Sequence, residues 1–172
     1  LKQGITHRLG RNGAARLVTA LKAMRNLEDE KPQRAMALLK RAIVKSKDSF
    51  WLRYIGGCIL YYNDASANET RLRQALEAID SALKVQTKAC GYSLRAAINL
   101  ELGEAERSIA DARSALALDA GDEVASLCLM ESLLNIGRKS EALEEARRSS
   151  KILPRNGFAL ARAGRIQGIL GD

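Results

Sequence analysis

Apolar residues recur every three or four positions through most of the chain, in short runs that glycine, proline or polar triplets interrupt. This period predicts amphipathic helices of about three turns joined by tight turns. From residue 89 to residue 156, two such helix pairs follow one another at a spacing of 34 residues, so that Gly103 aligns with Gly137 and Ser108 with Ala142. One helix pair cannot bury its own apolar face, and a repeat of this length is therefore typical of a solenoid.

The first of these two copies resembles a known repeat family. Residues 92–119 read YSLRAAINLELGEAERSIADARSALALD, with Tyr92, Ala96, Gly103 and Ala115 at positions four, eight, fifteen and twenty-seven of the unit. The segment resembles a tetratricopeptide repeat, and its Tyr-Ser-x-Arg-Ala-Ala opening is similar to the second repeat of chaperone-binding domains in that family. The resemblance implies an all-α, right-handed superhelical solenoid of helix-turn-helix units, with about four and a half repeats.

The periodicity divides the chain into an arm and a series of units. We expect a flexible basic arm at residues 1–13 and one repeat domain at 14–172, with units at about 14–48, 49–88, 89–122 and 123–156 and a partial unit at 157–172. Pro32 suits the first turn of the second helix of its unit. In the second unit a polar loop, residues 63–70, replaces the tight turn, and helix is expected to resume at about Arg71. That loop contains the glycosylation pattern Asn68-Glu69-Thr70, which we attribute to chance, since Asn68 or Thr70 can cap the next helix.

In this family the first helices of successive repeats line a concave groove, and the resemblance implies which positions face it. The candidate groove residues are Trp51, Tyr54, Cys58, Tyr61, Ser93, Ala97, Leu100, Leu127, Glu131 and Arg165, together with Cys90, Val124, Leu134, Phe158 and Ala161 at equivalent positions. Such a surface is mostly apolar and has an aromatic end, which suits an extended or helical peptide with bulky apolar side chains. The sequence therefore predicts a protein-binding scaffold or adaptor.

Two points about this groove stay open at the level of sequence. Either Gly56 or Gly57 takes the small position of the second unit, and a shift of one residue moves the groove positions to their neighbours. The aromatic residues Trp51, Tyr54 and Tyr61 belong either to the groove or to the core between repeats. The carboxylate grip of chaperone-binding members is not expected, because Leu94, Val124 and Cys128 stand where that grip uses asparagine and basic residues.

The net charge of +8 lies entirely at the amino end. Residues 1–50 hold twelve Lys or Arg against four Asp or Glu, whereas residues 51–172 hold sixteen of each. We define as the basic ridge the residues Arg34, Lys40, Arg41, Lys45 and Lys47 on the second helix of the first unit. This end could bind nucleic acid in a ribonucleoprotein or chromatin assembly. The alternative is a solvated helix face, which the lack of aromatic residues among these charges favours.

The sequence offers no constellation for catalysis, a cofactor or a metal. Cys58, Cys90 and Cys128 lie 32 and 38 residues apart, which fits neither metal-ligand spacing nor a disulfide framework. We expect them to be small buried apolar residues in a reducing compartment, cytoplasmic or nuclear; a redox-sensing thiol is the alternative. The single histidine, His7, has no carboxylate beside it. No apolar run approaches the roughly 18 residues of a membrane span.

The carboxyl end predicts a second contact surface. Residues 157–172 read as the first helix of a fifth unit without a second helix, and they carry the apolar residues Phe158, Leu160, Ile166 and Leu170. Terminal repeats normally need a polar outer face. We therefore expect further repeats of a larger chain, a second copy or a partner to pack against these residues.

Overall fold

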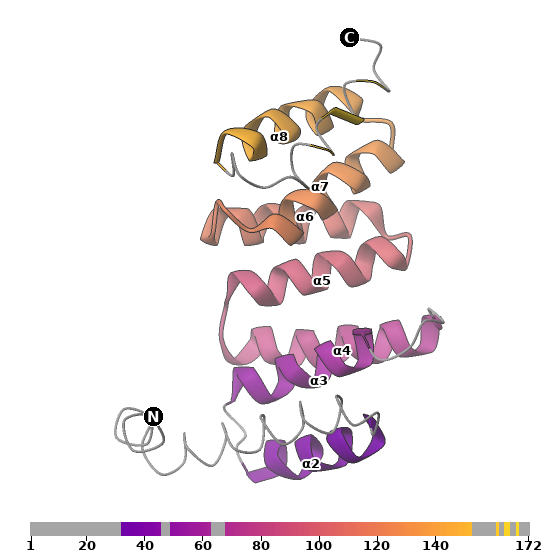
Figure 1. Ribbon diagram of the computed structural model, residues 1–172. Coiled ribbons are helices and arrows are strands. Elements are labelled where there is room, and N and C mark those ends of the chain that lie inside the picture. The colour runs from indigo at the N-terminus through magenta and orange to yellow at the C-terminus, as the bar shows by residue number, and fades with distance from the viewer. Residues whose placement is uncertain are drawn as a thin grey trace. The chain divides into compact units, whose positions relative to one another are not determined.

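In a computed structural model the described residues are 32–45, 49–62 and 68–152, with positions 161, 164, 165 and 168 beyond them. All regular secondary structure in these ranges is helical (Figure 1). The chain divides into two compact units at residues 86 and 87. The predicted all-α class is therefore confirmed for the described part, while the arm at 1–13 and the first helix of the first repeat lie outside it.

The first compact unit contains α2 (Pro32–Lys45), α3 (Phe50–Tyr62) and α4 (Glu69–Val85). Helix α2 begins at Pro32, as predicted, because proline has no N–H to donate and its fixed φ suits the first turn. Leu52 and Ile59 of α3 are almost fully buried, and Ala42 and Ile43 of α2 pack against them. On its other side α3 packs along α4. The apolar period of each helix thus forms the core of this unit.

Gly57, and not Gly56, faces α4 at a point too close for a side chain. A Cβ atom on Gly57 would lie 2.3 Å from Cδ1 and 2.7 Å from Cγ1 of Ile79 on α4, whereas one on Gly56 would meet no described atom within 4 Å. This settles the register that the sequence left open. In that register Phe50 is 3% exposed and belongs to the core, and Trp51 is 53% exposed.

Helix α4 begins two residues before the predicted start at Arg71. Asn68 is its N-cap, and the Asn68 side chain accepts a hydrogen bond from the Thr70 N–H at 2.9 Å. Glu69 follows in the first turn, where a carboxylate is favoured, and it pairs with Arg73 one turn later at 3.0 Å. Capping therefore accounts for Asn68, and Thr70 lies inside the helix.

The second compact unit contains α5 (Ala89–Glu101), α6 (Ala105–Leu118), α7 (Glu123–Asn135) and α8 (Lys139–Ile152). The first and last residues of α7 and α8 lie 34 positions after those of α5 and α6. Gly103 and Gly137 end the first helix of each pair with φ of 75° and 78°, a left-handed conformation that favours glycine. The N–H groups of both glycines donate to carbonyls three residues earlier at 3.0 Å. The two turns are thus copies of each other.

Small residues let these four helices pack closely. Each helix contacts the next in chain order, and α5 also contacts α7. Ala96, Ser108 and Ser132, from α5, α6 and α7, are fully buried. The Ser132 hydroxyl donates to Ser108 Oγ at 2.8 Å, and the Ser108 hydroxyl donates to the Ala96 carbonyl at 2.9 Å. A chain of two hydrogen bonds therefore links α5, α6 and α7 through buried residues.

Candidate functional site

The predicted groove residues of α5 divide into buried and accessible ones. Ser93 and Ala97 are buried, at 4% and 8% exposed, whereas Cys90 and Leu100 are half-buried. The Ser93 hydroxyl lies within hydrogen-bond distance of the Asp122 carboxylate and of the Ala89 carbonyl. The structure thus places Ser93 in the contact between two repeats, and Cys90 and Leu100 remain as the accessible positions on α5.

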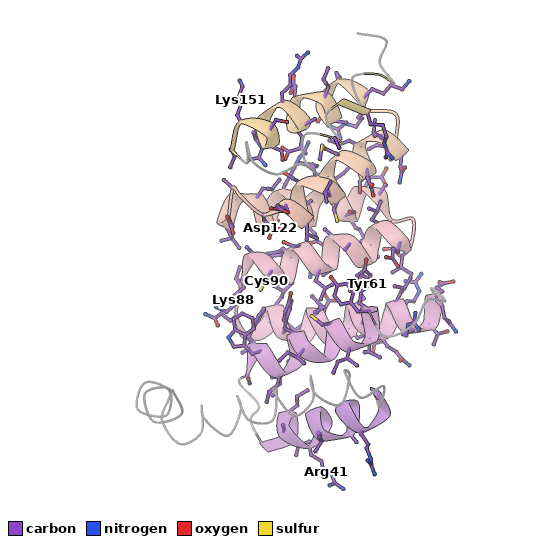
Figure 2. The ribbon with its side chains drawn as sticks, in the orientation of Figure 1. Arg41, Tyr61, Lys88, Cys90, Asp122 and Lys151 are labelled. Atoms are coloured by element: carbon purple, nitrogen blue, oxygen red, sulfur yellow. The ribbon has the colours of Figure 1, made fainter. Side chains whose placement is uncertain are left out.

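Asp122 organises this end of the second compact unit. It is the N-cap of α7, where its Oδ1 accepts a hydrogen bond from the Ala125 N–H at 3.0 Å, and its other carboxylate oxygen is the one near Ser93. Figure 2 shows Asp122 and Cys90 at the same end of their helices. The first turns of α5 and α7 are therefore held side by side by one carboxylate.

The predicted groove residues of α7 are more accessible than those of α5. Val124 is 44% exposed, and Leu127, Glu131 and Leu134 are half-buried. Their spacing of three, four and three residues places them on one face of α7. Leu127 and Leu134 also pack against a core cluster that includes Met130. We define the α5–α7 strip as Cys90, Leu100, Val124, Leu127, Glu131 and Leu134, six residues on two helices in contact.

Aromatic residues gather on α3 in the first compact unit. Trp51 is exposed, and Tyr54, Cys58 and Tyr61 are half-buried on the same face. The Trp51 and Tyr54 rings meet edge to face with centroids 5.9 Å apart, and Phe50 stacks on Tyr54 at 5.5 Å. Phe50 is the aromatic residue of α3 that lies in the core. The side chain of Trp51, in contrast, is about half exposed and can contact solvent or a partner.

The basic ridge is partly described. Arg34 and Arg41 are exposed on α2, seven residues apart and hence on the same side. Lys40 and Lys45 lie within α2, and Lys47 lies outside the described residues. Figure 2 shows Arg41 pointing away from the helices. Val44, also exposed, adds an apolar side chain to this cationic helix.

The candidate residues at the carboxyl end are described at few positions. Ala161 and Arg165 are helical and exposed. Phe158, Leu160, Ile166 and Leu170, the predicted apolar contact surface, lie outside the described residues, as does His7.

Of the three cysteines, which were expected to be buried apolar residues, only Cys128 is buried. None of the three forms a disulfide within the described part of the chain, and Cys58 and Cys90 are half-buried. Burial raises the pKa of Cys128 to about 12. Burial also raises the pKa of Cys90, although Lys88 nearby acts in the opposite direction. A redox-sensing thiol needs a lowered pKa, so the structure favours the structural interpretation for these two residues.

Two buried carboxylates were not anticipated from the sequence. Asp111 and Glu145 occupy the same position in successive repeats, and both are under 9% exposed. Arg95 of α5 holds Asp111 through bonds of 2.9 and 2.6 Å. Arg148, one turn along α8, holds Glu145 through two bonds of 2.7 Å. The spacing of 34 residues between the two acidic residues was the only sequence signal for these pairs. It does not reveal the arginine partners, because Arg95 lies on another helix than Asp111, whereas Arg148 lies on the same helix as Glu145. Each buried carboxylate is thus paired with an arginine of the same compact unit.

The described ranges contain neither a candidate membrane-spanning helix nor a candidate metal site. No described helix is both long and apolar enough to cross a membrane. No group of three or more His, Cys, Asp or Glu residues among those described is arranged to hold a metal ion.

Comparison with solved structures gives several close matches in fold. The chain is similar to MamA (residues 41 to the end) of Desulfovibrio magneticus RS-1, with a TM-score of 0.75 and 18% identity over 95% of this chain and 88% of that one. It is also similar to a thermophilic tetratricopeptide protein of Thermus thermophilus, with a TM-score of 0.71 and 20% identity over 95% and 85%. A third match is YrrB, described as having an unusual peptide-binding site, with a TM-score of 0.69 and 16% identity over 89% and 76%.

Comparison with curated protein sequences finds no match. The family model of the tetratricopeptide repeat, in contrast, matches residues 6–160. That span includes every helix from α2 to α8, and the described helices follow the helix-turn-helix order of the family. The chain therefore belongs to the tetratricopeptide repeat family.

Proposed function

We propose that the chain is a non-catalytic scaffold that binds a peptide or a helix of a partner protein along the first helices of its repeats. The observation that carries the proposal is the α5–α7 strip. Apolar side chains at Leu100, Val124, Leu127 and Leu134 stay accessible there, although neighbouring alanines and serines are buried. Bulky apolar side chains of a partner segment would contact these residues, as in other groove-binding complexes.

The exposed aromatic residues of α3 support the same proposal from the first unit. Trp51 lies at the groove position of its helix and leaves half of its surface accessible. Tryptophan is enriched among residues that dominate binding energy in protein interfaces. Three cysteines that form no disulfide in the described part of the chain fit a reducing compartment, cytoplasm or nucleus. Residues Phe158, Leu160, Ile166 and Leu170 stay a predicted second contact surface.

The test is a selection of binding peptides from a library of random short sequences, with the whole chain as bait. We expect enriched peptides to carry bulky apolar side chains. Their binding should be lost in Val124→Arg, which places a charge in the strip, and retained in Ala110→Arg, which changes an exposed residue of α6 outside the strip. Peptides that bind Val124→Arg as well as the native chain would refute the proposal.

A second candidate function, docking on an anionic polymer through residues 1–50, rests on the exposure of Arg34 and Arg41. This candidate predicts that RNA or DNA is retained in filter binding at low salt, with an affinity that falls steeply as salt rises. Changing the five residues of the basic ridge to Glu should abolish retention. A chain that retains neither polymer at low salt would eliminate this candidate and leave the first one unaffected.

A further inference from the structure

One face of α7 alternates carboxylates with apolar side chains. Glu123, Leu127, Glu131 and Leu134 follow one another at intervals of four, four and three residues, which places them in one row along the helix. Glu123 is exposed, and the other three side chains are half-buried. Those three belong to the α5–α7 strip, and Glu123 continues the row at its amino end. A partner laid along the strip therefore meets acidic and apolar positions in turn.

The apolar residues of the strip have surface left for a partner to cover. Val124, next to Glu123, is 44% exposed, and Leu100, Leu127 and Leu134 are half-buried. Bulky side chains of a partner can therefore remove apolar surface from water at this face, which favours binding.

Carboxylates outnumber cations on the two helices that form the strip. Residues 88–101 and 122–135 comprise α5, α7 and their N-caps. Their charged residues are the carboxylates Glu101, Asp122, Glu123 and Glu131 and the cations Lys88 and Arg95. Arg95 is bound to the buried Asp111 of α6 at 2.6 Å. On these two helices Lys88 is then left to offset four carboxylates, so the strip favours a cationic partner.

The surroundings of Cys128, one turn after Val124 on α7, have the same sign of charge. Burial is the main reason for the raised pKa of this thiol, and the carboxylates of Asp122 and Glu101 raise it further. Asp122 precedes α7, and Glu101 is the last residue of α5. Negative charge thus reaches this surface from both helices.

We propose that the partner segment on the α5–α7 strip is an amphipathic helix whose contact face alternates lysine or arginine with bulky apolar residues. The apolar side chains of the partner would cover Leu127 and Leu134, and its cations would approach Glu123 and Glu131. This inference rests on the proposed function, since it names the chemistry of the partner that the strip binds.

The spacing of the row favours a helix over an extended chain. At about 1.5 Å per residue, the row spans about 16 Å from Glu123 to Leu134. A partner helix repeats this rise, so its side chains stay opposite the four positions. Side chains on one face of an extended chain are about 6.6 Å apart and would drift by about 3 Å over the same row.

Contacts that these carboxylates already make leave room for a cation of the partner. A carboxylate has two oxygens and can accept hydrogen bonds from more than one cationic group. Glu141 of α8 does so, since it accepts hydrogen bonds from both Arg113 and Arg138. A lysine of the partner would therefore add to the existing contacts of Glu131.

The test compares three synthetic peptides long enough to form a helix, which takes more than about 12 to 15 residues. They share leucine at two contact positions and differ at two others, which hold lysine, glutamine or glutamate. Each is titrated into the whole chain with labelled leucine and valine methyl groups. We expect NMR shifts at Leu100, Val124, Leu127 and Leu134, with the lysine peptide binding tightest and the glutamate peptide weakest. Lysine should exceed glutamine by about twofold to tenfold, and added salt should reduce the difference.

Two matched variants assign the preference to the row. Glu123→Gln should weaken binding of the lysine peptide by about twofold to fivefold and leave the glutamine peptide unaffected. Glu106→Gln removes an exposed carboxylate from the first turn of α6, a position like that of Glu123 but outside the strip, and should change neither affinity.

The outcomes separate this inference from the proposed function. Equal affinity of the three peptides for the strip, or no effect of Glu123→Gln, would overturn the inference and leave the proposed function standing. The inference also fails if no peptide shifts the strip up to about 10 mM, a concentration that would detect millimolar affinity. In that case the proposed function would fall only if the peptides selected from the random library also left the strip unshifted.

Discussion

At the scale of single residues, buried hydroxyl groups show how the repeats are fixed to one another. Ser108 and Ser132 share a hydrogen bond between α6 and α7, and Ser108 also reaches the Ala96 carbonyl on α5. Ser149 is also buried, but its Oγ has no hydrogen-bond partner among the described residues. A buried hydroxyl stabilises a fold when it is bonded and destabilises it when it is not. Loss of the hydroxyl should therefore lower the stability of the fold at Ser108 and not at Ser149.

We expect Ser108→Ala to lower the free energy of unfolding by about 1 to 3 kcal/mol, because it leaves the Ser132 hydroxyl without its acceptor. Ser149→Ala, the matched control, should be neutral or slightly stabilising. Urea denaturation followed by circular dichroism measures both. Equal losses for the two variants would contradict the hydrogen-bonded chain.

The thiol of Cys128 should be nearly inert at neutral pH. Its pKa is raised to about 12 by burial, so below that pH the group stays protonated and is a poor nucleophile. Alkylation of Cys128 by iodoacetamide, followed by mass spectrometry, should accelerate about tenfold per pH unit from about pH 7 to about pH 10 without levelling off. A plateau near pH 9, as for an ordinary cysteine, would show that the thiol is not buried as described.

At the scale of helices, the sequence predicts the boundaries of the repeated helix pairs. It does not predict the burial of Ser93 or the register of α3, because both depend on contacts with residues distant in the chain. The 34-residue helix pairs follow from Gly103 and Gly137, whose positive φ ends a helix wherever it occurs. The burial of Ser93 could not be foreseen, because it depends on Asp122 in the next repeat. The register of α3 was also undetermined, since two adjacent glycines satisfy the pattern equally and Ile79 of another helix decides between them.

That register makes a sharp prediction for the two glycines of α3. Gly57→Ala should destabilise the chain by about 1 to 3 kcal/mol, because its Cβ would overlap the buried side chain of Ile79. Gly56→Ala meets no described atom and should stabilise α3 by about 0.5 to 1 kcal/mol through helix propensity. Thermal melts of the two variants should shift in opposite directions. The reverse order would mean that Gly56 faces α4.

At the scale of the whole molecule, the family match gives the fold, whereas the accessible side chains are the basis of the proposed binding. Residues 6–160 match the tetratricopeptide family, and solved structures of the same fold cover up to 95% of the chain. The family register predicts which helix positions face a groove, but it did not predict that Ser93 and Ala97, two of those positions, would be buried. In a solenoid each repeat is stabilised mainly by its neighbours, so substitutions on exposed positions should change binding without unfolding the rest.

The central claim is that partners bind along the α5–α7 strip, and methyl NMR with one selected peptide tests it most directly. The account predicts that the peptide shifts the methyl signals of Leu100, Val124, Leu127 and Leu134, and that Val124→Arg removes these shifts while Ala110→Arg does not. Shifts confined to α6 and α8, with the signals of the strip unchanged at saturation, would contradict it.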